Sequence, residues 1–150
     1  MWELVRSISV ALWLCYLAVK DWKTKTVPSY VLFIGSALPL FCGMLRFGDN
    51  PKSHIAGIVM GMFFLLLSKL TEEGIAYADS WIILVLGFYL GFWEVVGILT
   101  LMWVILIPVS MVQFIRRKGA KKATIPMVPF LTVAYLITLI NGIIGKGGSV

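Results

Sequence analysis

The residues from Trp81 to Gln113 include one charged side chain, Glu94, and this apolar run constrains the fold more than any other feature of the chain. A helix needs about 20 apolar residues to cross the hydrocarbon core of a bilayer, so the run is too long for a single crossing. Gly91-Phe92-Trp93-Glu94 is the natural place for a reversal, with Glu94 in the turn. The run is therefore predicted to form two antiparallel membrane helices.

The rest of the chain has the same apolar character, with a mean hydropathy of +0.96 and 60% hydrophobic residues. Soluble domains are nearer half apolar. Backbone groups in lipid must be hydrogen-bonded internally, which helices achieve within one segment. We therefore predict an all-α, polytopic integral membrane protein that forms a single membrane-embedded domain over residues 1–150. The six expected spans are Trp2–Val19, Pro28–Arg46, His54–Leu70, Ile75–Phe92, Trp93–Ile115 and Ile125–Ile144.

Basic residues are distributed unequally between the two sides of these spans. Nine of the 13 lysines and arginines fall in the loops after the first, third and fifth spans, and four fall on the opposite side. Short loops rich in Lys and Arg stay cytoplasmic, so these three loops are predicted to face the cytoplasm and both termini the outside. His54 then lies on the outer side and is interpreted as an interfacial residue. Topology also accounts for the pI near 9.5, so no nucleic-acid partner is predicted.

The residues that most often bind metals are few and scattered. Cys15 and Cys42 lie alone inside predicted spans, and the one histidine, His54, is near neither of them. No grouping with the ligand spacing of a zinc site is present. No metal and no cofactor are predicted.

Two lone aspartates fall at the ends of predicted spans. Asp21 lies in the first loop, and Asp79 lies near the first turn of the fourth span. Two crossings separate these positions, so both aspartates are predicted to lie on the same face of the membrane. Two carboxyl groups that meet share one proton, so one can deprotonate a water while the other protonates or hydrogen-bonds a scissile carbonyl. Taken singly, Asp79 also fits a helix N-cap, and Asp21 a solvated turn residue.

The segments around both aspartates resemble motifs of the type IV prepilin (leader) peptidase family, which are membrane aspartyl peptidases. An Asp-x-[Arg/Lys]-x-x-x-[Ile/Val]-Pro motif is matched by Asp21-Trp22-Lys23-Thr24-Lys25-Thr26-Val27-Pro28. A Gly-x-Gly-Asp motif corresponds to Ala76-Tyr77-Ala78-Asp79, where alanine replaces both glycines. A late Ile-Pro-x-x-Pro-Phe segment is matched by Ile125-Pro126-Met127-Val128-Pro129-Phe130.

The resemblance implies an endopeptidase of a prokaryotic cell membrane that cleaves the basic leader from prepilins at the cytoplasmic face. Asp21 and Asp79 would be catalytic. The substrate partner would carry a basic leader followed by a hydrophobic helix. Larger members carry paired Cys-x-x-Cys sites and methylate the new N-terminus, whereas this chain resembles the compact, peptidase-only branch that serves Tad (Flp) pili. The residues expected to contact substrate or shape the site are Lys23, Pro28, Gly74, Ala76, Ala78, Pro126 and Pro129.

Two other classes of function remain open from the sequence. The alanines at Ala76 and Ala78 are compatible with a weak or silent relative that acts as a partner in pilus or secretion assembly. A small transporter is the other alternative, although transporters generally place an ionisable residue in mid-span. The oligomeric state stays open.

Overall fold

Long apolar segments separated by short polar ones produce an entirely helical structure over the residues that can be described. The computed structural model describes residues 1–24, 27–71, 77–116 and 125–147. The helices are α1 (Trp2–Thr24), α2 (Ser29–Arg46), α3 (Pro51–Leu70), α4 (Tyr77–Leu90), α5 (Phe92–Arg116) and α6 (Val128–Gly147). The predicted all-α, multi-pass membrane architecture is confirmed.

The helices differ in length, and α4 is the shortest. The other five are long and apolar enough to cross a membrane. With 14 residues, α4 is about 21 Å long, less than the hydrocarbon core of about 30 Å. Its side chains are nevertheless the most enclosed, and Ile82, Val85 and Leu86 are almost completely buried. The predicted fourth span is therefore a short helix that its neighbours surround.

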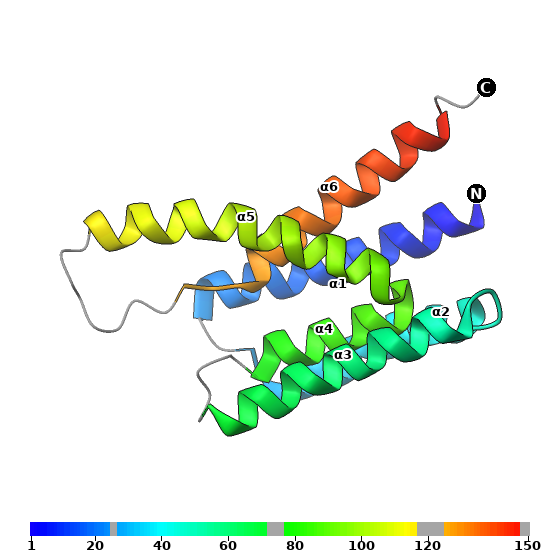
Figure 1. Cartoon of the computed structure of the whole chain (residues 1–150), viewed down its shortest axis with the longest axis horizontal. Helices are drawn as coiled ribbons and strands as arrows, with labels where there is room; N and C mark the ends of the chain where they lie inside the picture. Colours follow the sequence, from blue (N-terminus) through cyan, green and yellow to red (C-terminus); the bar gives the residue numbers. More distant parts are fainter. Residues whose placement is uncertain (25–26, 72–76, 117–124, 148–150) are drawn as a thin grey trace.

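The six helices pack as two groups, which Figure 1 shows one above the other. The α1–α5–α6 group is held by contacts of α6 with both α1 and α5, and in the α2–α3–α4 group α4 packs on α2 and α3. Helices α1, α3 and α5 end at one end of the bundle, where α2, α4 and α6 begin (Figure 1). We call this the dyad end, because it contains Asp21 and Asp79, and we call the opposite end the far end.

Glycines allow α3 and α4 to approach each other until their backbones touch. Gly57 and Gly61 are four residues apart on α3, the small-xxx-small spacing of closely packed membrane helices. A Cβ atom on Gly57 would collide with the backbone of Gly87, and one on Gly61 with the backbone of Leu84. Helix α4 is therefore held against α3 along most of its length.

Substitution of Gly57 tests this close packing. Alanine normally stabilises a helix by about 1 kcal/mol relative to glycine, but overpacking costs about 1–3 kcal/mol. We expect Gly57→Ala to lower the Tm of the purified protein by several degrees in a thermal-shift measurement. Gly97 has open space around its Cβ position, so Gly97→Ala is the matched control and should leave the Tm unchanged or raised. An equal response of the two variants would contradict the close approach.

The reversal between α4 and α5 takes a single residue, Gly91. Its φ of 92° lies in the region that favours glycine. The N–H of Phe92 donates a hydrogen bond to Ser53 Oγ of α3 (3.2 Å), which fixes the start of α5. The prediction that Glu94 lies in this turn is wrong: Glu94 lies in the first turn of α5, and its Oε1 is 3.7 Å from Arg46 Nη2. One residue with positive φ is enough to turn the chain, so the helix resumes before Glu94.

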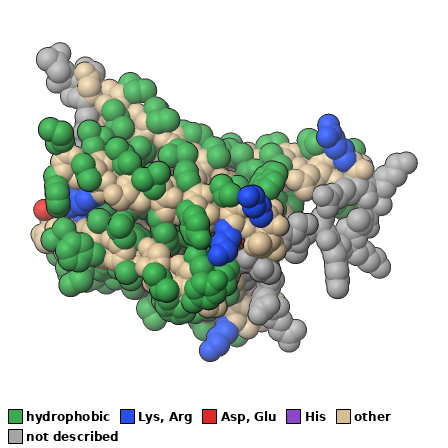
Figure 2. Space-filling view, turned by 180° about the vertical axis from the view of Figure 1, so that it is seen from behind, with side chains coloured by type: hydrophobic (Ala, Val, Ile, Leu, Met, Phe, Trp, Pro, Cys, Tyr) green, Lys and Arg blue, Asp and Glu red, His purple; other side chains and the backbone are tan. Residues whose placement is uncertain are grey.

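The surface is mostly apolar. Figure 2 shows hydrophobic side chains covering the length of the bundle on this face, with Lys and Arg side chains near its ends. Large exposed apolar residues occur on all five long helices, for example Leu12, Phe41, Phe63, Ile107 and Ile144. Such a surface suits lipid rather than water, in agreement with a multi-pass membrane protein.

Candidate active site

Asp21 lies inside α1 and not in a loop, which corrects the sequence-based prediction. Helix α1 continues to Thr24, and only 8% of Asp21 is exposed. The backbone N–H of Val128 donates a hydrogen bond to its carboxyl group. Asp21 is thus a buried side chain with a fixed partner, and the interpretation as a solvated turn residue is wrong.

The partner of Asp21 is the first residue of α6. Pro129 is the second residue of that helix, where proline is tolerated because its missing N–H has no partner within the helix. One turn further, Thr132 Oγ1 contacts the carbonyl oxygen of Leu14 in α1 at 3.3 Å, which aligns the two helices. Free backbone N–H groups at the start of a helix favour a negatively charged group. The start of α6 therefore positions the carboxyl group of Asp21.

Asp79 lies in the first turn of α4, as predicted, and is 6% exposed. Its neighbour Ser80 donates a hydrogen bond from Oγ to the carbonyl oxygen of Phe64 in α3 (3.2 Å). Helix α3 continues for six more residues to Leu70, a distance of about 9 Å. Asp79 is therefore recessed below the end of its neighbouring helix.

The two aspartates lie at the same end of the bundle, and their carboxyl groups interact electrostatically. Asp21 belongs to the α1–α5–α6 group and Asp79 to the α2–α3–α4 group, so the pair forms where the groups meet. Two buried carboxyl groups in such an arrangement can hold one shared proton and act on a water molecule as base and acid. This chemistry suits hydrolysis without a covalent intermediate.

The other predicted site residues have different positions. Lys23 is exposed in the last turn of α1, and Pro28 precedes α2 as its N-cap residue. Ala78 is half-buried beside Asp79 and packs against the core. Pro126 and Pro129 are half-buried around the start of α6. Gly74 and Ala76 lie outside the described residues.

Sequence reasoning did not identify Val128 as a partner of Asp21. The contact is made by a backbone N–H from a helix more than 100 residues away in the chain. The Ile-Pro-x-x-Pro-Phe segment was the available signal, because proline in a first turn marks the start of a helix. The spacing alone does not say which side chain that helix start faces.

His54 lies in the first turn of α3 at the far end, away from the aspartates as predicted, but its side chain is enclosed by the protein. It is buried, and its Nδ1 donates a hydrogen bond to the carbonyl oxygen of Phe88 (2.8 Å). The close packing of α3 on α4 encloses the ring. Within the described part of the chain, no three His, Cys, Asp or Glu side chains are grouped so that they could bind a metal ion.

The chain was compared with protein families, curated proteins and solved structures. The family described as the type IV leader peptidase family matches residues 8–145, which include both aspartates, all of α2 to α5 and most of α1 and α6. No curated protein and no solved structure matches the chain.

Proposed function

The chain belongs to the type IV leader peptidase family, and from this premise we propose that it is an aspartic endopeptidase in which Asp21 and Asp79 cleave the leader peptide from prepilins. The observation that carries the proposal is the presence of two buried carboxyl groups, from different helices, that interact at one end of the bundle. Structural aspartates would not need to be buried within electrostatic reach of each other, because burying like charges near one another is costly.

The proposed reaction uses one water molecule and the shared proton. The ionised carboxyl group takes a proton from water as the oxygen attacks the scissile carbonyl carbon, and the protonated carboxyl group donates a hydrogen bond or proton to the carbonyl oxygen. Breakdown of the tetrahedral intermediate breaks the C–N bond, and the leaving nitrogen takes up a proton from the pair. The products are the leader with a new carboxyl group and the mature pilin with a new amine. No cofactor takes part in these steps.

The recess of Asp79 indicates how the substrate would be cut. The scissile bond must reach a position about 9 Å inside the end of α3. A leader in extended conformation spans about 3.3 Å per residue, so about three residues cover this depth. The basic part of the leader would then stay among the headgroups at the membrane surface.

We assign the substrates to the Tad (Flp) class of pilins. The support is that the two cysteines lie in α1 and α2, on separate helices, and cannot form the paired Cys-x-x-Cys sites of the larger methylating members. Methylation of the mature N-terminus is therefore not part of the proposed activity.

Processing of a prepilin tests the proposed function. The purified protein in detergent is mixed with a synthetic prepilin that has a basic leader, a glycine before the cleavage site and an apolar helix. We expect two products, and mass spectrometry should place the cut directly after the glycine. An intact substrate at high enzyme concentration would favour the assembly-partner alternative, in which the fold is retained without hydrolysis.

The proposed orientation places the dyad end in the cytoplasm and both termini outside. In a Cys15→Ala/Cys42→Ala background, we expect a cysteine at exposed Lys23 to react with a membrane-impermeant maleimide only after the membrane is opened. A cysteine at exposed Lys52 should react in intact cells, since the Lys- and Arg-rich end stays cytoplasmic.

Leu38 provides the control for this labelling. It is exposed in the middle of α2 and would face lipid, so a cysteine at this position should react from neither side. Labelling of Lys23→Cys in intact cells would reverse the orientation and place the aspartates on the wrong side for a leader peptidase.

A further inference from the structure

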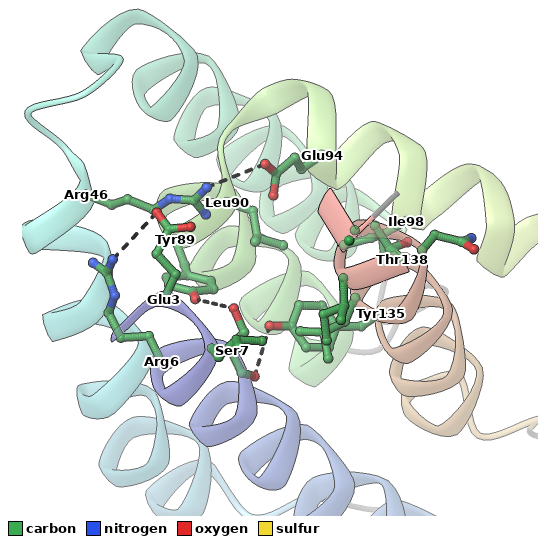
Figure 3. A pocket seen from close by; sticks show the side chains of 16 residues that line it. Glu3, Arg6, Ser7, Arg46, Tyr89, Leu90, Glu94, Ile98, Tyr135 and Thr138 are labelled. Atoms are coloured by element: carbon green, nitrogen blue, oxygen red, sulfur yellow. Dashed lines mark hydrogen bonds and ion pairs between the residues drawn. The ribbon is translucent and has the colours of Figure 1, made fainter. Parts of the chain in front are cut away.

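A cavity in the described part of the chain lies at the far end, away from both aspartates. Its volume is about 670 Å³. It is lined by α1, α4, α5 and α6, with Arg46 of α2 at its edge (Figure 3). The volume is within the range of small-molecule sites, and the proposed peptidase reaction does not use it.

Four charged side chains line one edge of the cavity, and they are of balanced sign. Arg6 Nη2 is 3.9 Å from Glu3 Oε1, and Arg46 Nη2 is 3.7 Å from Glu94 Oε1. Both contacts are longer than a charge-assisted hydrogen bond, which is about 2.7–2.9 Å. Arg46 and Glu94 therefore keep donor and acceptor capacity for a ligand. Figure 3 shows both side chains beside the pocket.

Hydroxyl groups form a second polar layer inside the cavity. Tyr135 Oη donates a hydrogen bond to the carbonyl oxygen of Ser7 (3.2 Å), and Ser7 Oγ lies 3.4 Å from Tyr89 Oη. Both tyrosines are buried. The rest of the wall also contains the polar residues Thr138 and Asn141 but is mainly apolar, with Leu4, Leu90, Ile98, Leu139 and Ile143.

We infer that this cavity binds one phosphatidylethanolamine molecule, with its phosphate at Arg46, its ammonium group at Glu94, and acyl-chain carbons along the apolar wall. Charge complementarity favours this ligand. An anionic headgroup would compete with Glu94 for Arg46 and offer that carboxylate no ammonium group in return. A choline headgroup has no N–H with which to donate a hydrogen bond to a carboxylate.

The position of the cavity favours a lipid over a soluble zwitterion. The exposed tryptophans Trp2 and Trp93 lie at the far end, at the starts of α1 and α5. Tryptophan is enriched where headgroups meet the hydrocarbon core. The cavity therefore lies at the level of the membrane where the headgroup of a phospholipid meets its acyl chains. Its charged edge and apolar wall match these two parts of the lipid.

Lipid retention by the full chain tests this inference. The protein is purified in detergent, mixed with equal amounts of dioleoyl phosphatidylethanolamine, phosphatidylcholine and phosphatidylglycerol, and analysed by native mass spectrometry. We expect one phosphatidylethanolamine to be retained about tenfold more than either competitor. A tenfold difference in affinity is about what one charge-assisted hydrogen bond contributes. Soluble phosphoethanolamine at the same concentration should not displace it.

Two variants and one control locate the site. Glu94→Gln should remove most of the preference for phosphatidylethanolamine. Gly142 lines the cavity and has open space at its Cβ position, so Gly142→Leu should fill part of the cavity and lower retention about tenfold or more, as loss of ligand contacts of this size implies. Gly97 has equal space but does not line the cavity, and Gly97→Leu should retain lipid like the wild type.

The following outcomes would overturn the inference: equal retention of the three lipids, preference for phosphatidylglycerol, displacement by phosphoethanolamine, or unchanged retention in Gly142→Leu. Because binding is read directly, the result does not depend on whether the protein cleaves a prepilin.

Discussion

Replacement of either aspartate by asparagine is expected to abolish prepilin cleavage. Asparagine has nearly the same shape but cannot exchange a proton, so Asp21→Asn removes one half of the proposed acid–base pair and Asp79→Asn the other. General acid–base catalysis raises a reaction rate by about 10²–10⁴-fold. When two residues act as a unit, removing either one loses most of this increase. We expect each variant, assayed with the synthetic prepilin, to cleave at least about 10³-fold more slowly than the wild type, and the double variant to be little slower still.

Asp49→Asn is the matched control for these two variants. Asp49 is an exposed carboxylate in the turn between α2 and α3, at the far end, and its substitution should leave the rate unchanged. Membrane abundance and Tm of all variants should be compared, because burial could make an aspartate structurally necessary. Cleavage near the wild-type rate in Asp21→Asn or Asp79→Asn, at equal abundance, would refute the assignment of the pair.

Restoring glycine before the second aspartate should accelerate cleavage. Alanine is about 1 kcal/mol more favourable than glycine in a helix, so Ala76 and Ala78 together bias this segment toward a regular helix by about 2 kcal/mol. If cleavage requires the segment to bend so that Asp79 approaches Asp21, this bias depletes the competent state by a factor of about 30. We expect Ala76→Gly/Ala78→Gly to cleave faster by up to this factor and to have a slightly lower Tm.

Ala37→Gly separates this effect from a general loss of helix stability. Ala37 is exposed on α2, away from the aspartates. Its substitution should lower the Tm in the same way without raising the rate. If the double-glycine protein cleaves no faster than the wild type, the alanines are compatible with the backbone conformation that cleavage requires. The glycines of the family motif are then not needed here.

Hydropathy and charge predicted the helices well but not where polar side chains find their partners. Most predicted span limits agree with the helices, because apolar length is a local property. Asp21 was assigned to a loop because it lies in the polar segment Lys20-Asp21-Trp22-Lys23. A helix that continues past its apolar stretch gives no hydropathy signal, and the contact that buries Asp21 comes from α6.

The same limit explains why the burial of His54 and the corrected position of Glu94 were not predicted. Their partners are the Phe88 carbonyl oxygen and the Arg46 guanidinium group, each more than 30 residues away. The far-end cavity was also not predicted. Its one local signal was the presence of tyrosines in apolar segments, since a buried Tyr hydroxyl usually has a partner.

The contacts between the two helix groups have a mechanical consequence for the aspartates. Three of these contacts lie at the far end and join Ser7 to Tyr89, Ser53 to Phe92, and Arg46 to Glu94. They hold the two groups together at the far end. Asp21 is 14 residues beyond Ser7 along α1, a lever of about 21 Å, so a tilt of about 5° between the groups moves its carboxyl group by about 2 Å. Since a displacement of about 1 Å can cost a hundredfold in rate, we expect the proposed peptidase activity to depend on the angle between the groups.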